Sequence, residues 1–93
     1  LNESLNNIRI VTGHNIDYMD KFADKANKAA KALSTSTLNY TDASLIYYQQ
    51  GLSDQEVEDR TAVTTTMANA AGESAEKISD QLTAVWNNFY DGS

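Results

Sequence analysis

The chain has 93 residues, with one histidine and neither cysteine nor proline, so it forms one small domain without disulfides, thiolate zinc sites or a cysteine nucleophile. Hydrophobic residues make up 41%, as in a folded soluble protein, and no stretch approaches the ~18 apolar residues of a membrane span. The whole formal net charge of −6 falls on residues 51–93, and such a surface repels phosphate backbones, so we expect no specific nucleic-acid partner and no membrane partner.

Two helices are expected in the first third of the chain. The first covers residues 2–12, where Leu5, Ile8 and Val11 form a short apolar stripe before Gly13, and glycine commonly follows the end of a helix. The second covers residues 15–33, where apolar side chains recur every three or four positions. These are Ile16, Met19, Phe22, Ala23, Ala26, Ala30 and Leu33. The alanines limit side-chain bulk, so another helix can approach this face closely.

A polar connector and a short helix follow. Residues 34–37 read Ser-Thr-Ser-Thr, and their hydroxyls compete for backbone hydrogen bonds, which favours a loop. Thr41 is the expected N-cap of a short helix over residues 42–50, which Gly51 follows.

The last two expected helices each begin at a serine. Ser53 and Glu56 have the spacing of a capping box, in which each side chain bonds the backbone of the other residue. That helix continues through three consecutive threonines, which favour strands by their branching, to Gly72. Its expected buried stripe is Val57, Thr61, Thr64, Ala68 and Ala71, with Val63 and Met67 beside it. Ser74 caps the last helix, whose apolar positions are Ala75, Ile78, Leu82, Val85, Trp86 and Phe89.

These segments predict an all-α fold. We expect a small helical bundle of about four to five amphipathic helices joined by short Gly/Ser turns, with residues 1–93 forming a single helical domain. Because Leu1 rather than methionine comes first, we expect this domain to be a fragment of a much longer protein.

Residues that could support catalysis or metal binding have simpler explanations. His14 is the single imidazole, and we expect it at a helix start or on the surface. Asp17, Asp20 and Asp24 alternate with lysines, which predicts a solvated, charge-balanced helix face rather than a cation site.

A second acidic cluster lies near residue 56. Its members are Asp54, Glu56, Glu58 and Asp59, which lack the glycine and spacing of a calcium loop. Favourable interaction with a helix N-terminus explains the first two carboxylates without a metal. The sequence also lacks a glycine-rich phosphate loop and a nucleophile elbow. We therefore expect no enzyme activity, no catalytic residues, no cofactor and no metal.

Aromatic residues are the candidates for contact with a protein partner. These are Tyr47, Tyr48, Trp86 and Tyr90. Aromatic side chains offer large contact areas at interfaces. Because consecutive side chains on a helix point in different directions, at least one of Tyr47 and Tyr48 is expected outside the core. The other interpretation is that they are ordinary half-buried tyrosines.

Three stretches of the chain carry a family resemblance. They are YTDASLIYYQQGLS at residues 40–53, MANAA at residues 67–71 and SDQLTAVWN at residues 79–87. An apolar helix ends in Gly-Leu-Ser, an alanine-rich helix ends near Ala-Gly, and a serine-capped helix follows. In this order the chain resembles the tape measure proteins of long-tailed bacteriophages and prophages, which are minor tail proteins, over roughly residues 12–92.

The resemblance implies a structural function. Tape measure proteins are long, mostly helical virion proteins that occupy the lumen of the tail tube. They set tail length during tube polymerisation and leave ahead of the DNA at infection. The implied location is the virion tail, and the bacterial host cytoplasm during assembly. The implied partners are the tail tube protein and tail assembly chaperones, and self-association is left open. The alternative is a non-catalytic helical adaptor domain that binds a protein partner through exposed aromatics.

Overall fold

The described part of the chain consists of five α-helices joined by turns. The structure is a computed structural model that describes the backbone of residues 3–90 and the side chains of residues 3–86. The helices are α1 (Glu3–Thr12), α2 (Ile16–Ala32), α3 (Thr37–Gln49), α4 (Asp54–Ala71) and α5 (Ala75–Tyr90). The prediction of a small all-α bundle is confirmed, and the threonine run of α4 is helical.

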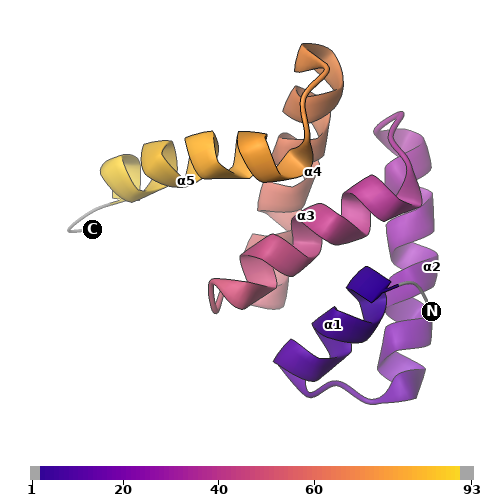
Figure 1. The fold of residues 1–93 in the computed structure, drawn as a ribbon. Helices are drawn as coiled ribbons and strands as arrows, with labels where there is room; N and C mark the ends of the chain where they lie inside the picture. Colours follow the sequence, from indigo (N-terminus) through magenta and orange to yellow (C-terminus); the bar gives the residue numbers. More distant parts are fainter. Residues whose placement is uncertain (1–2, 91–93) are drawn as a thin grey trace.

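Helix α3 occupies the centre of the arrangement. Helices α1 and α2 lie on one side of α3, and α4 crosses it on the other side (Figure 1). Helix α5 also contacts α3 and α4, and its C-terminal half extends away from the other helices (Figure 1). The radius of gyration is 12.8 Å, close to the value of about 12 Å for a compact chain of this length.

Local capping sets most helix boundaries where the sequence predicts them. The Ser53 hydroxyl accepts the Glu56 amide, and the Glu56 carboxylate accepts the Ser53 amide, so the capping box is confirmed. Helix α4 ends at Gly72, whose φ of 69° lies in the left-handed region that glycine adopts without strain. The Ser74 hydroxyl accepts the Lys77 amide and caps α5 as expected.

The start of α3 differs from the prediction. The helix begins at Thr37 with Ser36 as its N-cap, because the Ser36 hydroxyl accepts the Asn39 amide. The expected cap, Thr41, lies inside the helix, where its buried hydroxyl donates to the Leu38 carbonyl. The extra turn brings Tyr40 onto the alanine face of α2, where it packs with Ala26 and Ala30. Tertiary packing therefore extends the helix into the polar connector.

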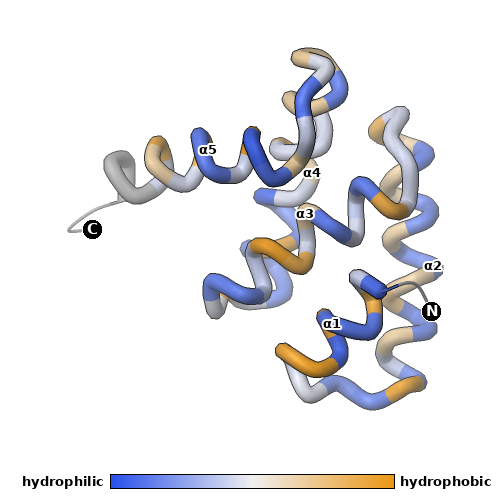
Figure 2. Tube along the Cα trace, viewed as in Figure 1, coloured by the Kyte–Doolittle hydropathy of each residue, from blue (hydrophilic) through white to orange (hydrophobic). Residues whose placement is uncertain are grey.

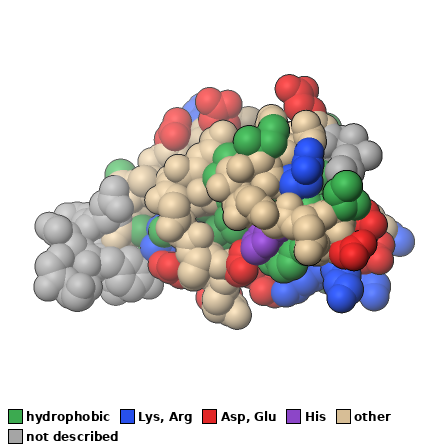
Figure 3. Space-filling view, turned by 90° about the horizontal axis from the view of Figure 1, so that it is seen from below, with side chains coloured by type: hydrophobic (Ala, Val, Ile, Leu, Met, Phe, Trp, Pro, Cys, Tyr) green, Lys and Arg blue, Asp and Glu red, His purple; other side chains and the backbone are tan. Residues whose placement is uncertain are grey.

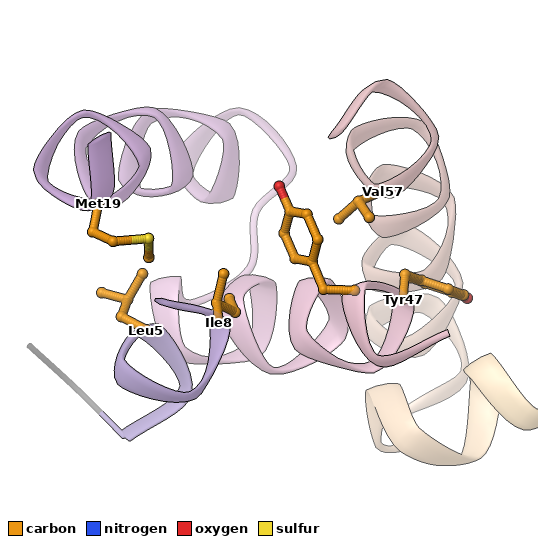
Figure 4. Packing of buried hydrophobic residues seen from close by; sticks show 6 residues of the cluster. Leu5, Ile8, Met19, Tyr47 and Val57 are labelled. Atoms are coloured by element: carbon orange, nitrogen blue, oxygen red, sulfur yellow. The ribbon is translucent and has the colours of Figure 1, made fainter. Parts of the chain in front are cut away.

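The main hydrophobic core joins four helices. Its buried residues are Leu5 and Ile8 of α1, Met19 of α2, Tyr47 and Tyr48 of α3, and Val57 of α4. Five of them are labelled in Figure 4, where α3 extends from α1 and α2 at one end to α4 at the other.

Several apolar residues of the expected stripes are exposed. Ile16 is 60% exposed and Val11 is 45% exposed, and Figure 2 shows hydrophobic colour at this surface, where α1 ends and α2 begins. Val63 and Met67 of α4 and Val85 of α5 are exposed as well. Ala71, expected in the buried stripe of α4, is also exposed. Val63 and Met67 are exposed because they lie on the outward face of α4, whose neighbouring residues Thr61, Thr64 and Ala68 are buried.

Replacing a core isoleucine of α1 tests this arrangement. Ile8 is fully buried, whereas Ile10 on the same helix is 66% exposed. We expect Ile8→Ala to lower the free energy of unfolding by about 2–5 kcal/mol, because it removes buried methyl groups and leaves a cavity. The matched change Ile10→Ala should cost less than about 0.5 kcal/mol. Urea unfolding followed by circular dichroism measures both, and equal losses would contradict the placement of α1.

The capping box of α4 generates a pH prediction. Hydrogen bonds from the Ser53 backbone amide and hydroxyl hold the pKa of Glu56 below its ordinary value. The stabilisation is therefore present above the pKa of the unfolded state and is lost as the pH falls through the folded pKa. We expect the wild-type protein to lose more stability between pH 6 and pH 3 than Glu56→Gln, which keeps a capping side chain but does not titrate. Urea midpoints at the two pH values compare them, and identical losses would show that the Glu56 carboxylate contributes nothing to the pH dependence of stability.

Candidate functional site

The two consecutive tyrosines of α3 are both in the core. Tyr47 is 0% exposed and Tyr48 is 7% exposed, so the expectation that at least one of them lies outside the core was wrong. The reason is the central position of α3, which has helices on both sides. Tyr47 meets α4 and α5, and Tyr48 meets α2 and the start of α4. Neither side chain offers surface to a partner in this fold.

Trp86 is half-buried and connects α5 to the core. Its ring packs edge-on against Tyr47 with centroids 5.6 Å apart, and the Arg60 guanidinium lies 4.7 Å from the centre of the indole ring. An arginine over an aromatic face is attracted by the ring's negative surface. Trp86 therefore packs α5 against α3, through Tyr47, and against α4, through Arg60. The side chain of Tyr90, the fourth candidate, lies outside the described residues.

Buried hydroxyl groups join α3 to α4. The Tyr47 hydroxyl lies 2.5 Å from the Thr64 hydroxyl, and the Ser44 hydroxyl lies 3.1 Å from the Thr61 hydroxyl. Burial raises the pKa of Tyr47 above its ordinary value, so its phenol stays protonated. Among the described residues, no buried side-chain nitrogen or oxygen lacks a hydrogen-bond partner. Sequence reasoning missed these pairs, although the threonine run of α4 was the available signal.

A polar cluster joins the starts of α2 and α4 to the end of α3. The Tyr48 hydroxyl donates to Asp54 Oδ1 at 2.8 Å, and His14 Nε2 lies 3.7 Å from the same oxygen. The His14 ring stacks on Tyr18 with centroids 3.7 Å apart. His14 lies just before the start of α2, as expected, and its side chain is 29% exposed. It lies at the surface between acidic and hydrophobic side chains (Figure 3, purple).

The contacts of this cluster hold the starts of α2 and α4 against the end of α3. Burial, with the nearby Asp54 carboxylate, raises the pKa values of Tyr48 and Tyr18 above the ordinary value for tyrosine. A phenol with a raised pKa donates hydrogen bonds at neutral pH but is a poor nucleophile.

The carboxylates near the start of α4 each have a structural partner. Asp54 accepts from Tyr48, and Glu56 caps Ser53. Glu58 forms an ion pair of 2.9 Å with Lys25, and Asp59 accepts from Gln55. Because these groups point to different partners, they do not converge on one point. Within residues 3–86, no three His, Cys, Asp or Glu side chains come together as a metal site would require.

The acidic residues of α2 lie on its solvent-exposed surface. Asp17, Asp20 and Asp24 are all exposed. Ion pairs in the described part of the chain include those of Lys25 with Glu58, Lys77 with Glu73 and His14 with Asp54, and none of these three involves an acidic residue of α2.

A hollow of about 300 Å³ lies between α2, α3 and the start of α4. Its walls are largely aromatic, from Tyr18, Phe22, Tyr40 and Tyr48. The Lys25 and Glu58 ion pair also lines it.

A larger groove of about 710 Å³ lies between α3, the end of α4 and the start of α5, and we call it the acidic groove. Four carboxylates line it, whereas none of its lining residues is lysine or arginine. Its lining is Thr35, Asn39, Asp42, Leu45, Ile46, Gln49, Thr65, Ala68, Asn69, Gly72, Glu73, Ser74, Ala75, Glu76, Ser79 and Asp80. Sequence reasoning located the acidic half of the chain but not this concave surface, because the groove depends on the angle between α4 and α5. In the described residues, no helix is long and apolar enough to cross a membrane.

A double-mutant cycle tests the hydroxyl contact between α3 and α4. Tyr47→Phe and Thr64→Val each leave one buried hydroxyl without its partner, so we expect each to lower stability by about 1–3 kcal/mol. The double variant should cost less than the sum of the two, because it removes both hydroxyls. Chemical unfolding of the four proteins measures the coupling. Strictly additive losses would show that the two hydroxyls do not interact.

Comparison of the chain with protein-family models, with curated proteins and with solved structures found no match in any of the three. The resemblance to tape measure proteins therefore stays a prediction, which rests on the residues that carry it.

Proposed function

We propose that this chain is a structural segment of a phage tail tape measure protein, which acts in tail assembly and tail-length determination and is released at DNA ejection. One observation carries the proposal. The longest of the three stretches that carry the resemblance, residues 40–53, forms most of α3 and the turn that leads to the capping serine of α4. The residues that carry the resemblance are thus among those on which the other helices pack, so the resemblance covers the part of the chain that organises this fold.

The chemistry of the described residues supports a non-catalytic role. The carboxylates near the start of α4 serve the helix cap, the ion pair to α2 and the bond to Tyr48. The phenols of Tyr47 and Tyr48 are buried and protonated. In this proposal the segment acts through its length and its contacts. Its partners are the tail tube protein and tail assembly chaperones, in the host cytoplasm during assembly and in the virion tail afterwards.

The dimensions of the fold give the proposal a quantitative test. The bundle extends 36 Å along its longest axis. The same 93 residues as one continuous helix would extend about 140 Å, at a rise of 1.5 Å per residue. The contribution of the segment to tail length therefore distinguishes the bundle from an extended ruler.

The experiment is an in-frame deletion of these 93 residues from the parent phage gene, with tail lengths measured by negative-stain electron microscopy. We expect shorter tails. Shortening by about 140 Å means that the segment works as extended helix, and shortening by no more than 36 Å means that it keeps the bundle. As a control, an unrelated helical sequence of the same number of residues should restore the length of an extended ruler. Infectious particles with unchanged tail length would contradict the proposal.

The adaptor alternative loses support from the aromatic side chains. Tyr47 and Tyr48 are buried, and Trp86 packs between Tyr47 and Arg60. The side chain of Tyr90, the fourth aromatic candidate, lies outside the described residues, so this conclusion rests on the other three.

A further inference from the structure

The acidic groove combines an apolar floor with a charged rim. Leu45 and Ile46 of α3, Ala68 of α4 and Ala75 of α5 contribute apolar surface. Ala68 is buried, and the other three are half-buried. The residues that line the groove come from α3, the end of α4, the turn after it, the start of α5 and, with Thr35, the turn that joins α2 to α3. Its volume of about 710 Å³ lies within the range of surfaces that hold a ligand or a row of partner side chains.

Two of the four carboxylates that line the groove have a hydrogen-bond or ion-pair partner, and two have none in the described part of the chain. Asp42 accepts a hydrogen bond from Ser4, and Glu73 pairs with Lys77 at 3.3 Å. Glu76 and Asp80 are exposed and stand four residues apart on α5, and in the described part of the chain neither side chain forms an ion pair or a hydrogen bond. Like charges at this spacing on a helix repel each other. A cation between them would relieve the repulsion.

We propose that the acidic groove docks an amphipathic helix of another protein that carries lysine or arginine on one edge. The charge complementarity selects a cationic partner, and the apolar floor selects one with an aliphatic face, which is the helix-in-groove mode of recognition. The groove lining has four carboxylates and no lysine or arginine, so it would repel a nucleic acid or an anionic membrane. This inference does not depend on the tape measure proposal, because it rests on the groove alone.

The test uses a synthetic amphipathic helical peptide with leucine and alanine on one face and lysine along one edge of that face. The peptide is titrated into the ¹⁵N-labelled 93-residue chain, and binding is followed by NMR. We expect chemical-shift changes at Ile46, Ala68 and Ala75, and weaker binding as salt rises. The double variant Glu76→Gln and Asp80→Asn should weaken binding about fivefold or more, as expected for the loss of two ion pairs.

A matched control separates the groove from general attraction to an acidic protein. Asp17→Asn and Asp20→Asn remove the same charge from exposed positions on α2 that do not line the groove. This variant should change the dissociation constant less than about twofold. Circular dichroism checks that both double variants keep the fold.

Three results would overturn the proposal. The first is equal weakening by both double variants, which would mean non-specific attraction. The second is a set of shift changes that lies away from the groove. The third is a dimer of this chain that the groove variant abolishes in sedimentation measurements, which would assign the groove to a second copy.

Discussion

Helix α3 is surrounded by the other helices, and the fold depends on this burial. Its buried side chains point in several directions, to Ala26 and Ala30 of α2, to Val57 and Thr64 of α4, and to Trp86 of α5. A helix buried on several faces has no clean apolar stripe, because each face is matched to a different neighbour. Each outer helix packs mainly against α3 and one neighbouring helix, whereas α3 contacts all four of the others. This explains why α3 mixes tyrosine, serine, threonine and alanine in its core positions.

Buried hydroxyl groups form much of the contact between α3 and α4. Ser44, Tyr47, Thr61 and Thr64 bond in pairs across it, and Thr65 bonds back to the carbonyl of its own helix. Hydroxyl pairs contribute less net stability than the same area of aliphatic packing, because water satisfies them in the unfolded chain. They do define one register, since a shifted helix would leave buried hydroxyls unpaired.

The candidate surfaces differ in how far the sequence could locate them. The concentration of carboxylates after residue 50 is visible in the sequence, and it predicts an acidic surface without saying where that surface is concave. The placement of Glu76 and Asp80 beside Ile46 requires the turn at Gly72, which sets the angle between α4 and α5. For Tyr47 and Tyr48 the environment expected from the sequence was wrong, because both are buried. Tyr47 and Tyr48 are adjacent, and a helix with one buried face would expose one of them.

The sequence by itself determined the local structure of this protein. The spacing of Leu5 and Ile8, the capping box at Ser53 and the left-handed turn at Gly72 depend on contacts within about one helical turn, so they can be recognised along the chain. Only the tertiary structure decided that α3 begins at Thr37 and that both of its consecutive tyrosines are buried. It also decided which apolar residues stay exposed and where a groove opens. These features depend on how many helices surround a residue and at what angle, and that information lies in contacts between distant parts of the chain.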